Sequence, residues 1–393
     1  MKRFHLSKLT FLLATLLSLV LIIAQVACGT PSQSGISTPL PSGTSTPLPS
    51  GTWTIVNSPN GSLPDSVLNS VAVVSAKDVW ASGVSNCRND TCSETLIEHW
   101  NGSQWGVVTS PNTKRTFNAT NYLAVISAND IWAVGGSSDV HSYNAQTLIE
   151  HWNGSQWSVV TSPNPGNHQN DLNGSVAISK KDVWAVGDFG STGSSIVKTM
   201  VLHWNGSQWS VVQSPSAGTF YAVTAVSKKD VWAVGGYGSP SKTLIEHWNG
   251  ARWSVVTSPN VGTNDNLLGA VTAVSANDVW AVGGYEGTKT LIEHWNGASW
   301  SVVTSPNVGT TGNFLGAVTA VSANDIWAVG GYELDNGNGQ TLIEHWNGTS
   351  WSVVASPNGS SDDFFNNVAA GSANDIWAVG GEEGTNTLIA HCC

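Results

Sequence analysis

The sequence predicts an all-β fold, a seven-bladed β-propeller of four-stranded antiparallel blades that is closed by its own N-terminal strand. Three observations predict it. One segment recurs seven times at a spacing of 44–52 residues, a period typical of solenoids and propellers. Each copy contains four short runs rich in Val, Trp, Ile and Thr, which read as strands. The first and last copies are incomplete in complementary ways, as a closed ring requires.

The N-terminus resembles an export signal. Basic residues precede an apolar run from Leu9 to Val26, which is the layout of a secretory signal. The run ends in Gln25-Val26-Ala27-Cys28-Gly29, which resembles a bacterial lipobox, although Leu is preferred where Gln25 stands. We therefore expect residues 1–27 to be a signal peptide and Cys28 to be lipidated. Plain secretion and an uncleaved transmembrane anchor are the alternatives, and all three place the remaining chain outside the cytoplasm.

Residues 28–52 are predicted to be a tether. They contain two near-copies of Ser-Thr-Pro-Leu-Pro-Ser-Gly-Thr, which start at Ser37 and Ser45. Pro fixes φ, and Gly and Ser supply no core, so such a segment stays extended and solvated. We expect it to hold the domain of residues 53–393 clear of a membrane.

Three landmarks define the repeat within residues 53–393. The motif Asp-(Val/Ile)-Trp-Ala begins at Asp78, Asp130, Asp182, Asp230, Asp278, Asp325 and Asp375. A His that precedes Trp, or Cys in the last copy, is found at His99, His151, His203, His247, His294, His345 and His391. A Trp opens the last apolar run of each unit at Trp53, Trp105, Trp157, Trp209, Trp253, Trp300 and Trp351. All 20 Trp residues belong to this repeat, and Cys392 stands where a twenty-first would be. The Trp side chains are expected to form the core.

The clearest copy shows how each unit becomes a sheet. Its first two runs are joined by the short turn Ala276-Asn277-Asp278, and its last two by Asn296-Gly297, a strong hairpin signal because the tight turn needs positive φ. Four antiparallel strands with apolar inner runs need burial on both faces, which radial stacking of sheets provides.

The two ends of the domain predict how the ring closes. Residues 53–58 form a fourth strand without the first three, and residues 387–391 form a third strand without a fourth. The two fragments complement each other, so the last blade is shared between both ends of the chain.

The repeat resembles kelch repeats, the blade type of galactose-oxidase-like propellers. The resemblance rests on a strand ending in Gly283-Gly284, an aromatic residue at Trp295 and a Trp beyond the turn at Trp300, and it covers residues 53–393. The family usually has Tyr where Trp295 stands. WD-repeat propellers are the near alternative, but their terminal Trp-Asp is absent. The copper chemistry of galactose oxidase does not carry over, because blades 2 to 6 contain no Cys for the Tyr–Cys crosslink.

The repeated polar residues are expected to be structural. Five of the seven landmark His residues follow a Glu, as in Glu293-His294, a pairing that suggests a metal or a general base. Ring symmetry disperses them over seven blades, so we expect each His to be satisfied by its own blade's turn or Glu, and each landmark Asp to fix a turn. His141 and His168 lie outside the repeat and are weak candidates for a metal site.

The five cysteines have different expected roles. Cys28 is the lipidation candidate, and Cys87 and Cys92 are expected to form a loop disulfide in an oxidising compartment. For Cys392 and Cys393, a vicinal disulfide, free thiols and an abnormal gene end all stay open.

The charge composition limits the classes of partner that the protein can bind. The formal net charge is -11 and only 10% of residues are charged, so the chain has no basic footprint for nucleic acid or anionic lipid. We expect contact with a membrane only through the lipid anchor, and a monomer.

The loops predict a binding function without catalysis. The turns between strands 1 and 2 and between strands 3 and 4 are nearly invariant, whereas the loops of the opposite face vary in length; we call this the variable-loop face. Binding residues favour varied loops over a rigid scaffold. The candidates are Tyr285, Tyr332, Glu333, Asp335, Asp362, Asp363, Glu382 and Glu383. Their chemistry suits a glycan, a peptide, a protein or a cationic ligand, and no cofactor is expected except a Ca²⁺ ion that carboxylates could hold. A carbohydrate-active hydrolase or lyase and a purely structural cell-surface module are the alternatives.

Overall fold

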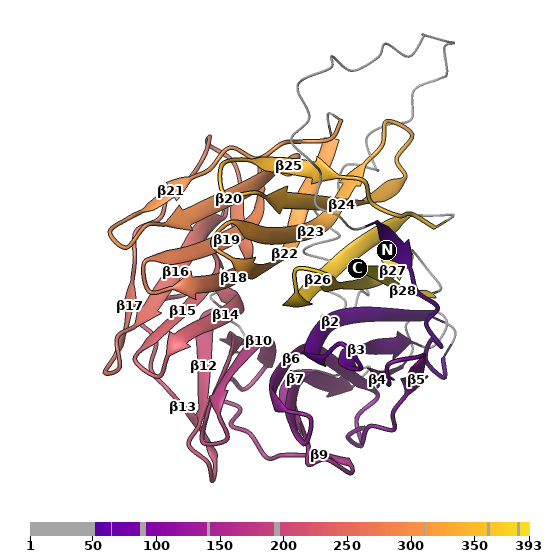
Figure 1. The fold of residues 1–393 in the computed structure, drawn as a ribbon. Helices are drawn as coiled ribbons and strands as arrows, with labels where there is room; N and C mark the ends of the chain where they lie inside the picture. Colours follow the sequence, from indigo (N-terminus) through magenta and orange to yellow (C-terminus); the bar gives the residue numbers. More distant parts are fainter. Residues whose placement is uncertain are drawn as a thin grey trace, which may run out of the picture.

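A computed structural model describes residues 52–63, 65–86, 92–139, 142–191, 197–309, 311–359, 362–382 and 386–393. The predicted signal peptide, Cys28 and all but the last residue of the tether lie outside the described residues. The described chain forms 28 strands that follow one another around a ring (Figure 1). The fold is therefore an all-β propeller of seven four-stranded blades, as predicted.

Each blade has four strands with fixed roles, and blade 1 is counted from the first complete unit. The innermost strands, which contact one another around the ring, are β2 (Asp65–Ser75), β6 (Phe117–Ser127), β10 (Gln169–Ser179), β14 (Thr219–Ser227), β18 (Asn266–Ser275), β22 (Thr311–Ser322) and β26 (Asp363–Ser372). The second strands are β3 (Asp78–Asn86), β7 (Asp130–Asp139), β11 (Asp182–Gly190), β15 (Asp230–Tyr237), β19 (Asp278–Tyr285), β23 (Asp325–Glu333) and β27 (Asp375–Glu382).

The outer half of each blade repeats in the same way. The third strands are β4 (Ser93–Trp100), β8 (Ser142–Trp152), β12 (Lys198–Trp204), β16 (Lys242–Trp248), β20 (Lys289–Trp295), β24 (Gly339–Trp346) and β28 (Asn386–Cys392). The short outermost strands are β1 (Trp53–Ile55), β5 (Trp105–Val107), β9 (Trp157–Val159), β13 (Trp209–Val211), β17 (Trp253–Val255), β21 (Trp300–Val302) and β25 (Trp351–Val354). All pairs within a blade are antiparallel, and one parallel bridge, Ser93 to Phe117, joins blades 1 and 2.

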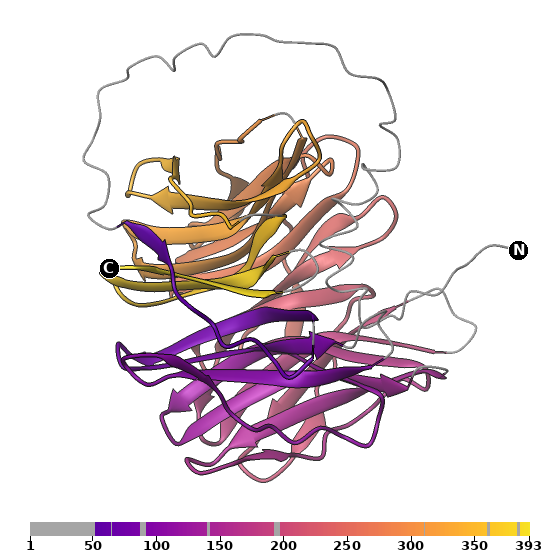
Figure 2. The same cartoon turned by 90° about the vertical axis from the view of Figure 1, so that its right-hand side faces the viewer.

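The ring closes through blade 7. Strand β1 pairs antiparallel with β28, with Trp53 opposite Cys392 and Ile55 opposite Ala390, so this blade has the order β1-β28-β27-β26. Figures 1 and 2 show the indigo N-terminal strand beside the yellow C-terminal strands. The prediction of a blade shared by both ends is confirmed.

Tryptophans interlock neighbouring blades. Trp280 on the second strand of blade 5 packs against Trp346 and Trp351 of blade 6, with ring centroids 4.9 and 5.7 Å apart. Equivalent contacts join the other blades, and the second-strand and outer-strand Trp residues are buried, as predicted for core. The seam between blades 6 and 7 differs, because Trp327 meets Trp53 edge to face at 5.7 Å and the third aromatic is replaced by the buried Cys392.

The Asn-Gly turns form as predicted. Gly297 adopts φ 91°, a left-handed conformation that glycine reaches without strain. The Asn296 Oδ1 atom accepts hydrogen bonds from the backbone N–H groups of Ala298 at 3.0 Å and Ser299 at 3.1 Å. The side chain therefore stabilises its own turn.

Among the described residues, no helix is long and apolar enough to cross a membrane.

Candidate functional site

Each innermost strand has a β-bulge at the same place. Pairing with the second strand skips one residue, so that Leu268 and Ala270 pair with successive residues of β19 while Gly269 is left over. The equivalent bulge residues around the ring are Asn69, Asn121, Asn173, Tyr221, Gly269, Gly316 and Asn366. All seven line the central channel.

A glycine in each second strand makes this bulge fit. A Cβ on Gly283 would lie 1.9 Å from the Leu267 carbonyl oxygen, far inside the contact distance. Six other second strands have the same glycine with the same conflict, at Gly83, Gly135, Gly187, Gly235, Gly330 and Gly380. The glycine of the repeated Val-Gly step is thus explained by close backbone approach.

Asparagine amides bridge four of the seven blade junctions in the channel. The bulge Asn donates through its side-chain nitrogen to the carbonyl just before the bulge of the next blade. These bonds are Asn69 to Thr120 at 3.1 Å, Asn121 to Leu172 at 2.8 Å, Asn173 to Phe220 at 2.8 Å and Asn366 to Leu68 at 3.0 Å. The bulge residue of blades 4, 5 and 6 is Tyr or Gly, so the channel wall is asymmetric.

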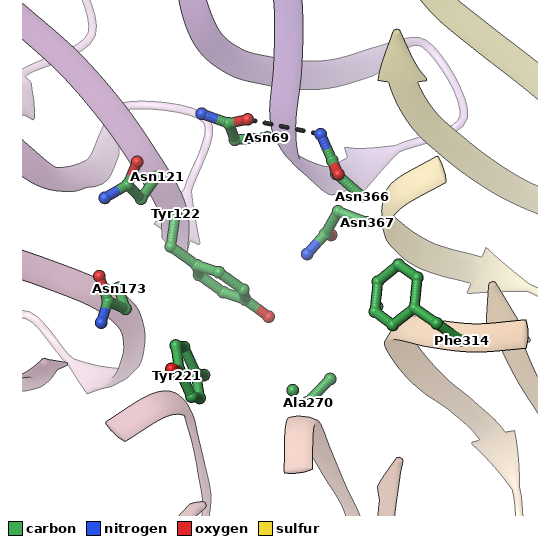
Figure 3. Close-up of a pocket in the computed structure, with 11 residues that line it drawn as sticks. Asn69, Asn121, Tyr122, Asn173, Tyr221, Ala270, Phe314, Asn366 and Asn367 are labelled. Carbon is green, nitrogen blue, oxygen red and sulfur yellow. Dashed lines mark hydrogen bonds between the residues drawn. The ribbon is translucent and has the colours of Figure 1, made fainter. Parts of the chain in front are cut away.

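The channel contains a cavity of about 80 Å³. The bulge residues line it together with Tyr122, Ala270, Phe314 and Asn367 (Figure 3). A water molecule needs roughly 10–15 Å³ in the same measure, and drug-sized ligands need a few hundred. The cavity therefore holds several waters or the end of a chain, but not a whole oligosaccharide.

Tyr122 reaches across the channel. Its ring points from blade 2 into the cavity, toward the side where Asn367 of blade 7 lies (Figure 3). Burial raises the pKa of the Tyr122 hydroxyl, and Asn367 opposes this shift. Tyr122 is therefore a neutral aromatic side chain that can stack and can donate one hydrogen bond.

Four of the acids predicted from the sequence gather at the junction of blades 6 and 7. Asp363 and Glu382 are opposite each other in the ladder of β26 and β27. The Asp362 carboxylate accepts a hydrogen bond from the Gly339 N–H of blade 6 at 2.6 Å. Glu333, at the end of β23, is close enough to Asp362 for their charges to interact. We call Glu333, Asp362, Asp363 and Glu382 the acidic cluster.

Two members of the acidic cluster are buried strand residues, so the prediction that they belong to the variable loops is wrong. Asp363 is 1% exposed and Glu333 is 6% exposed. Burial raises the pKa of both carboxyl groups, and neighbouring acids add to the effect in each case. For Asp363, a hydrogen bond accepted from the Gly359 N–H acts in the opposite direction. A cation brought close would favour the ionised forms.

The other predicted ligand residues occupy different surroundings. Tyr285 and Tyr332 are half-buried and pack against apolar clusters that neighbouring blades share, and the Lys289 amine lies 5.5 Å from the Tyr285 ring centroid. Asp335 is exposed in the loop between β23 and β24. Glu383 lies outside the described residues. The structure thus brings together half of the predicted set.

The weak metal candidates find no support in the described part of the chain. His168 is half-buried before β10, and His141 lies outside the described residues. Across the described ranges, no group of three His, Cys, Asp or Glu side chains could hold a metal ion. A Ca²⁺ site on the variable-loop face stays a prediction.

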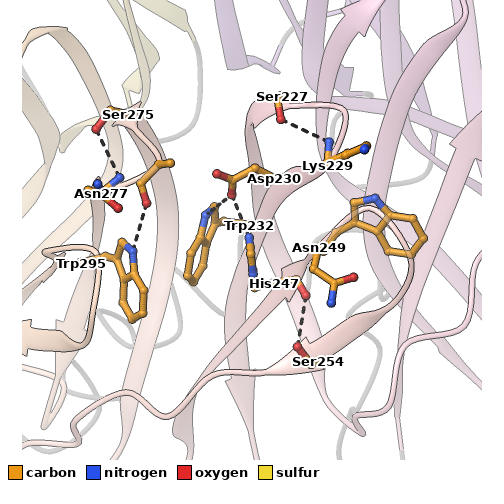
Figure 4. Close-up of polar contacts among 12 residues, drawn as sticks. Ser227, Lys229, Asp230, Trp232, His247, Asn249, Ser254, Ser275, Asn277 and Trp295 are labelled. Atoms are coloured by element: carbon orange, nitrogen blue, oxygen red, sulfur yellow. Dashed lines mark hydrogen bonds and ion pairs between the residues drawn. The ribbon is translucent and has the colours of Figure 1, made fainter.

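The repeated Asp and His residues pair in every blade, and in five blades the Asp also accepts a hydrogen bond from the Trp indole. In blades 2 and 3 the indole nitrogens of Trp132 and Trp184 have no hydrogen-bond partner among the described residues. In blade 4, Asp230 Oδ1 accepts from the Trp232 indole at 2.9 Å and lies 2.8 Å from His247 Nε2 (Figure 4). The His247 ring also stacks on Trp232 with centroids 4.2 Å apart. All seven His residues pair with the Asp of their own blade's first turn. The structural interpretation is right, and the partner is that Asp rather than the adjacent Glu.

The adjacent Glu residues are buried between blades. Glu98, Glu150, Glu246, Glu293 and Glu344 are each 0% exposed. Four of them accept a hydrogen bond from a Ser of the preceding blade, as Glu344 does from Ser305 at 2.8 Å. Glu293 has no hydrogen-bond partner among the described residues, and burial raises its pKa to about 8. These carboxyls face protein, not substrate.

The cysteine predictions are tested only in part of the chain. Cys92 is disulfide-bonded, but Cys87 lies outside the described residues, so their pairing stays a prediction. Cys392 and Cys393 are free thiols, the first buried and the second exposed. Burial raises the pKa of the Cys392 thiol to about 11.

Sequence reasoning missed the asparagine wall of the channel. Each bulge residue stands nine positions before the landmark Asp of its blade, for example Asn69 before Asp78. Aligning the copies on that Asp therefore aligns the seven channel positions. A polar residue at four of them, within an otherwise apolar strand, is the signal that could have found the site.

Comparisons with known proteins support the fold. No family model and no curated protein matches the chain. Among solved structures, the chain resembles YCF48 bound to a D1 peptide, with a TM-score of 0.56 and 12% identity over 88% of this chain and 97% of that one. The extracellular domain of the one-component system BT4673 from B. thetaiotaomicron gives 0.55 and 9%, over 86% of this chain and 40% of that one.

A third similar structure is the GH74 xyloglucanase from Xanthomonas campestris. It gives a TM-score of 0.53 and 12% identity over 84% of this chain and 53% of that chain. Identities this low establish the propeller fold and nothing finer. The resemblance to kelch repeats stays a prediction.

Proposed function

We propose that this chain is a non-catalytic binding propeller whose ligand enters from the variable-loop face and seats in the central cavity. The observation that carries the proposal is the asymmetry of the channel. The blades repeat the same Asp–His pair, yet the bulge residues around the cavity are Asn in four blades, Gly in two and Tyr in one. A rigid scaffold with varied residues around a concave site is how binding proteins are built.

The acidic cluster lies near the same site. Asp363 and Asn366 are three residues apart on β26, about 10 Å along a strand. None of the four acids lines the cavity, and Asp363 and Glu333 are buried, so a ligand would meet the cluster only where it extends beyond the cavity. A peptide is the ligand class we favour, because a structural neighbour was solved with a bound peptide and a chain end fits the cavity volume.

The proposed setting is the outer side of a membrane, with the propeller tethered through lipidated Cys28. The support is the basic and apolar N-terminus followed by the lipobox-like segment, and a kelch-type origin is proposed on the repeat pattern alone. Replacing Cys28 with Ser should release the domain or leave an unprocessed precursor, because acylation needs the thiol. Mass spectrometry of the mature N-terminus checks this, and a mature chain that begins downstream of Cys28 contradicts lipidation.

An array experiment tests the binding function. Wild-type protein and a Gly269→Tyr variant are applied to glycan and peptide arrays. Tyr occupies the equivalent bulge position at Tyr221, so the backbone tolerates it there, and its ring fills the cavity. We expect wild-type hits to disappear in the variant. Gly106→Tyr, on outer strand β5 where a Cβ meets nothing within 4 Å, is the matched control and should keep them.

A glycoside hydrolase is the second candidate, on one observation. Asp363 and Glu382 are opposite each other in the ladder, which places their Cβ atoms roughly 5 Å apart, and glycosidases use a pair of neighbouring carboxyl groups. The structurally similar GH74 xyloglucanase suggests polysaccharides as the substrate class. A screen for sugar release from polysaccharides tests this candidate, with Asp363→Asn as the variant that should lose activity. No release from any substrate removes it.

A further inference from the structure

We propose that the cavity selects a ligand that ends in a primary ammonium or guanidinium group, which docks at the two glycine bulges of blades 5 and 6. This inference rests on the proposed function and names the ligand's chemistry. The feature that carries it is a gap in the channel wall at Gly269 and Gly316, where the amide bridges of the other blades are missing.

The gap is lined by backbone carbonyl oxygens. A Cβ on Gly269 would lie 3.6 Å from the Leu315 oxygen and 3.7 Å from the Gly316 oxygen. A Cβ on Gly316 would lie 3.4 Å from the Phe365 oxygen and 3.5 Å from the Asn366 oxygen. Leu315 and Phe365 occupy the positions whose carbonyls receive an Asn amide in the bridged blades. Glycine has no side chain to donate, so no amide from the preceding bulge reaches these two carbonyls.

Carbonyl oxygens accept hydrogen bonds and cannot donate them, so the gap selects a donor. An ammonium group carries three N–H donors and a guanidinium group carries five, and neither accepts. The bulge Asn residues of the bridged blades show that an N–H group placed here satisfies such a carbonyl, at 2.8–3.1 Å. A ligand ammonium would take the place of the missing amide.

Aromatic rings add a preference for positive charge. Tyr122 points into the cavity from blade 2, and Phe314 lies on the side of blade 6 (Figure 3). The Phe314 ring approaches to 3.0 Å from where a Gly316 Cβ would stand, so it borders the gap. A cation over an aromatic face is attracted by the ring quadrupole.

The acidic side chains of the neighbouring blades also favour a positively charged ligand. The acidic cluster belongs to blades 6 and 7, next to Gly316, and the Lys289 amine of blade 5 lies 3.7 Å from a Glu286 carboxylate oxygen. Asp171 and Asp188 form a second acid pair on blade 3, so the acids favour a cation without choosing one side of the channel. The cavity of about 80 Å³ matches an amine-terminated alkyl chain.

The probe is Nα-acetyl-lysine amide, titrated into the folded domain by calorimetry and compared with the uncharged Nα-acetyl-norleucine amide. We expect saturable binding of the lysine probe in the millimolar range, since only a few ligand atoms are buried, and at least tenfold weaker binding of the norleucine probe. 1,5-Diaminopentane forms a second arm. Tighter binding of the lysine probe indicates a protein side chain as the natural ligand, and tighter binding of the diamine indicates a free polyamine.

The variant Gly269→Asn tests the location. Asn is native at the equivalent position of four blades, and at Gly269 a Cβ makes only ordinary contacts, so the amide should bridge to Leu315 and occupy the gap. We expect at least a tenfold loss of lysine-probe binding, while Gly106→Asn keeps wild-type binding. Thermal unfolding of both variants checks that they are folded.

The outcomes separate this inference from the proposed function. Equal binding of the lysine and norleucine probes, no saturable lysine binding, or unchanged binding in folded Gly269→Asn overturns the ammonium assignment. If the arrays identify ligands without a positive charge and the Gly269→Tyr variant does not bind them, the binding function stands without the ammonium assignment. If array ligands survive Gly269→Tyr, the function itself fails.

Discussion

At the scale of single residues, polar side chains that look catalytic in the sequence are shared supports of the blades. Asp230 accepts hydrogen bonds at one oxygen from both Trp232 and His247, so one carboxylate holds a turn, an indole and an imidazole. The Asp–His pair recurs in all seven blades, which indicates that these histidines support the fold.

Removing this carboxylate should destabilise the domain. In Asp230→Ala, the indole and imidazole N–H groups of Trp232 and His247 lose their acceptor in a half-buried site, which costs about 2–3 kcal/mol. Urea unfolding measures the loss. Asp335→Ala, in the exposed loop, should change stability by less than about 0.5 kcal/mol, and equal effects of the two variants would contradict the assigned role.

The buried Glu residues predict a domain that is more stable in mild acid than in mild base. Burial raises the pKa of Glu98 and Glu150 to about 7, and of Glu293 and Glu344 to about 8, from an ordinary value of 4.5. The folded chain therefore binds these protons more tightly than the unfolded chain. The resulting stabilisation is complete below pH 4.5 and is lost as the pH rises toward 8.

Thermal unfolding between pH 5 and pH 8.5 checks this prediction. The midpoint should fall as pH rises, and Glu293→Gln should reduce the fall, because a neutral amide of the same shape replaces the carboxyl that has no hydrogen-bond partner among the described residues. A pKa shift of this size corresponds to a few kcal/mol at pH 8.5. Glu94→Gln removes an exposed carboxyl as the control, and a Glu293→Gln profile parallel to wild type would contradict the account.

At the scale of strands, closure of the ring depends on β1. Its three residues pair with β28, Trp53 packs on Trp327, and Ser58 continues the contact by bonding to Glu98 of blade 1 and to Thr387. One short segment therefore completes blade 7 and fastens it to both neighbouring blades.

A chain that begins at Pro59 should be much less stable than one that begins at Thr52. The truncation exposes the edge of β28 and the apolar faces that Trp53 covers, which costs several kcal/mol. Calorimetric or circular-dichroism melting compares the two chains. Equal midpoints would show that the blade does not need its N-terminal strand.

The structural features that can be predicted from the sequence are the ones that repeat in every blade. Strand roles, hairpin turns and closure follow from the Trp and Asn-Gly landmarks, because periodic burial leaves a periodic pattern. The bulge at Gly269 does not follow, since it depends on the pairing register of β18 against β19. Burial of Asp363 was also missed, because a residue next to a loop becomes the first residue of an inner strand only once the blades pack.

At the scale of the whole molecule, a nearly symmetric ring encloses an asymmetric channel. Asn amides bridge the junctions from blade 7 round to blade 4, and the glycine gap and the acidic cluster lie on blades 5 to 7. The symmetry gives stability through equivalent Trp contacts at six of the seven blade junctions, and the asymmetry provides one site in place of seven equivalent ones.

The measurement that tests this account most directly is NMR chemical-shift mapping of backbone amides with the tightest array ligand, or with Nα-acetyl-lysine amide. The account predicts shifts at Gly269, Gly316 and Asn366, which line the cavity. Shifts confined to the Asn-Gly turns at Asn101, Asn153 and Asn205, which belong to the opposite face, would contradict it.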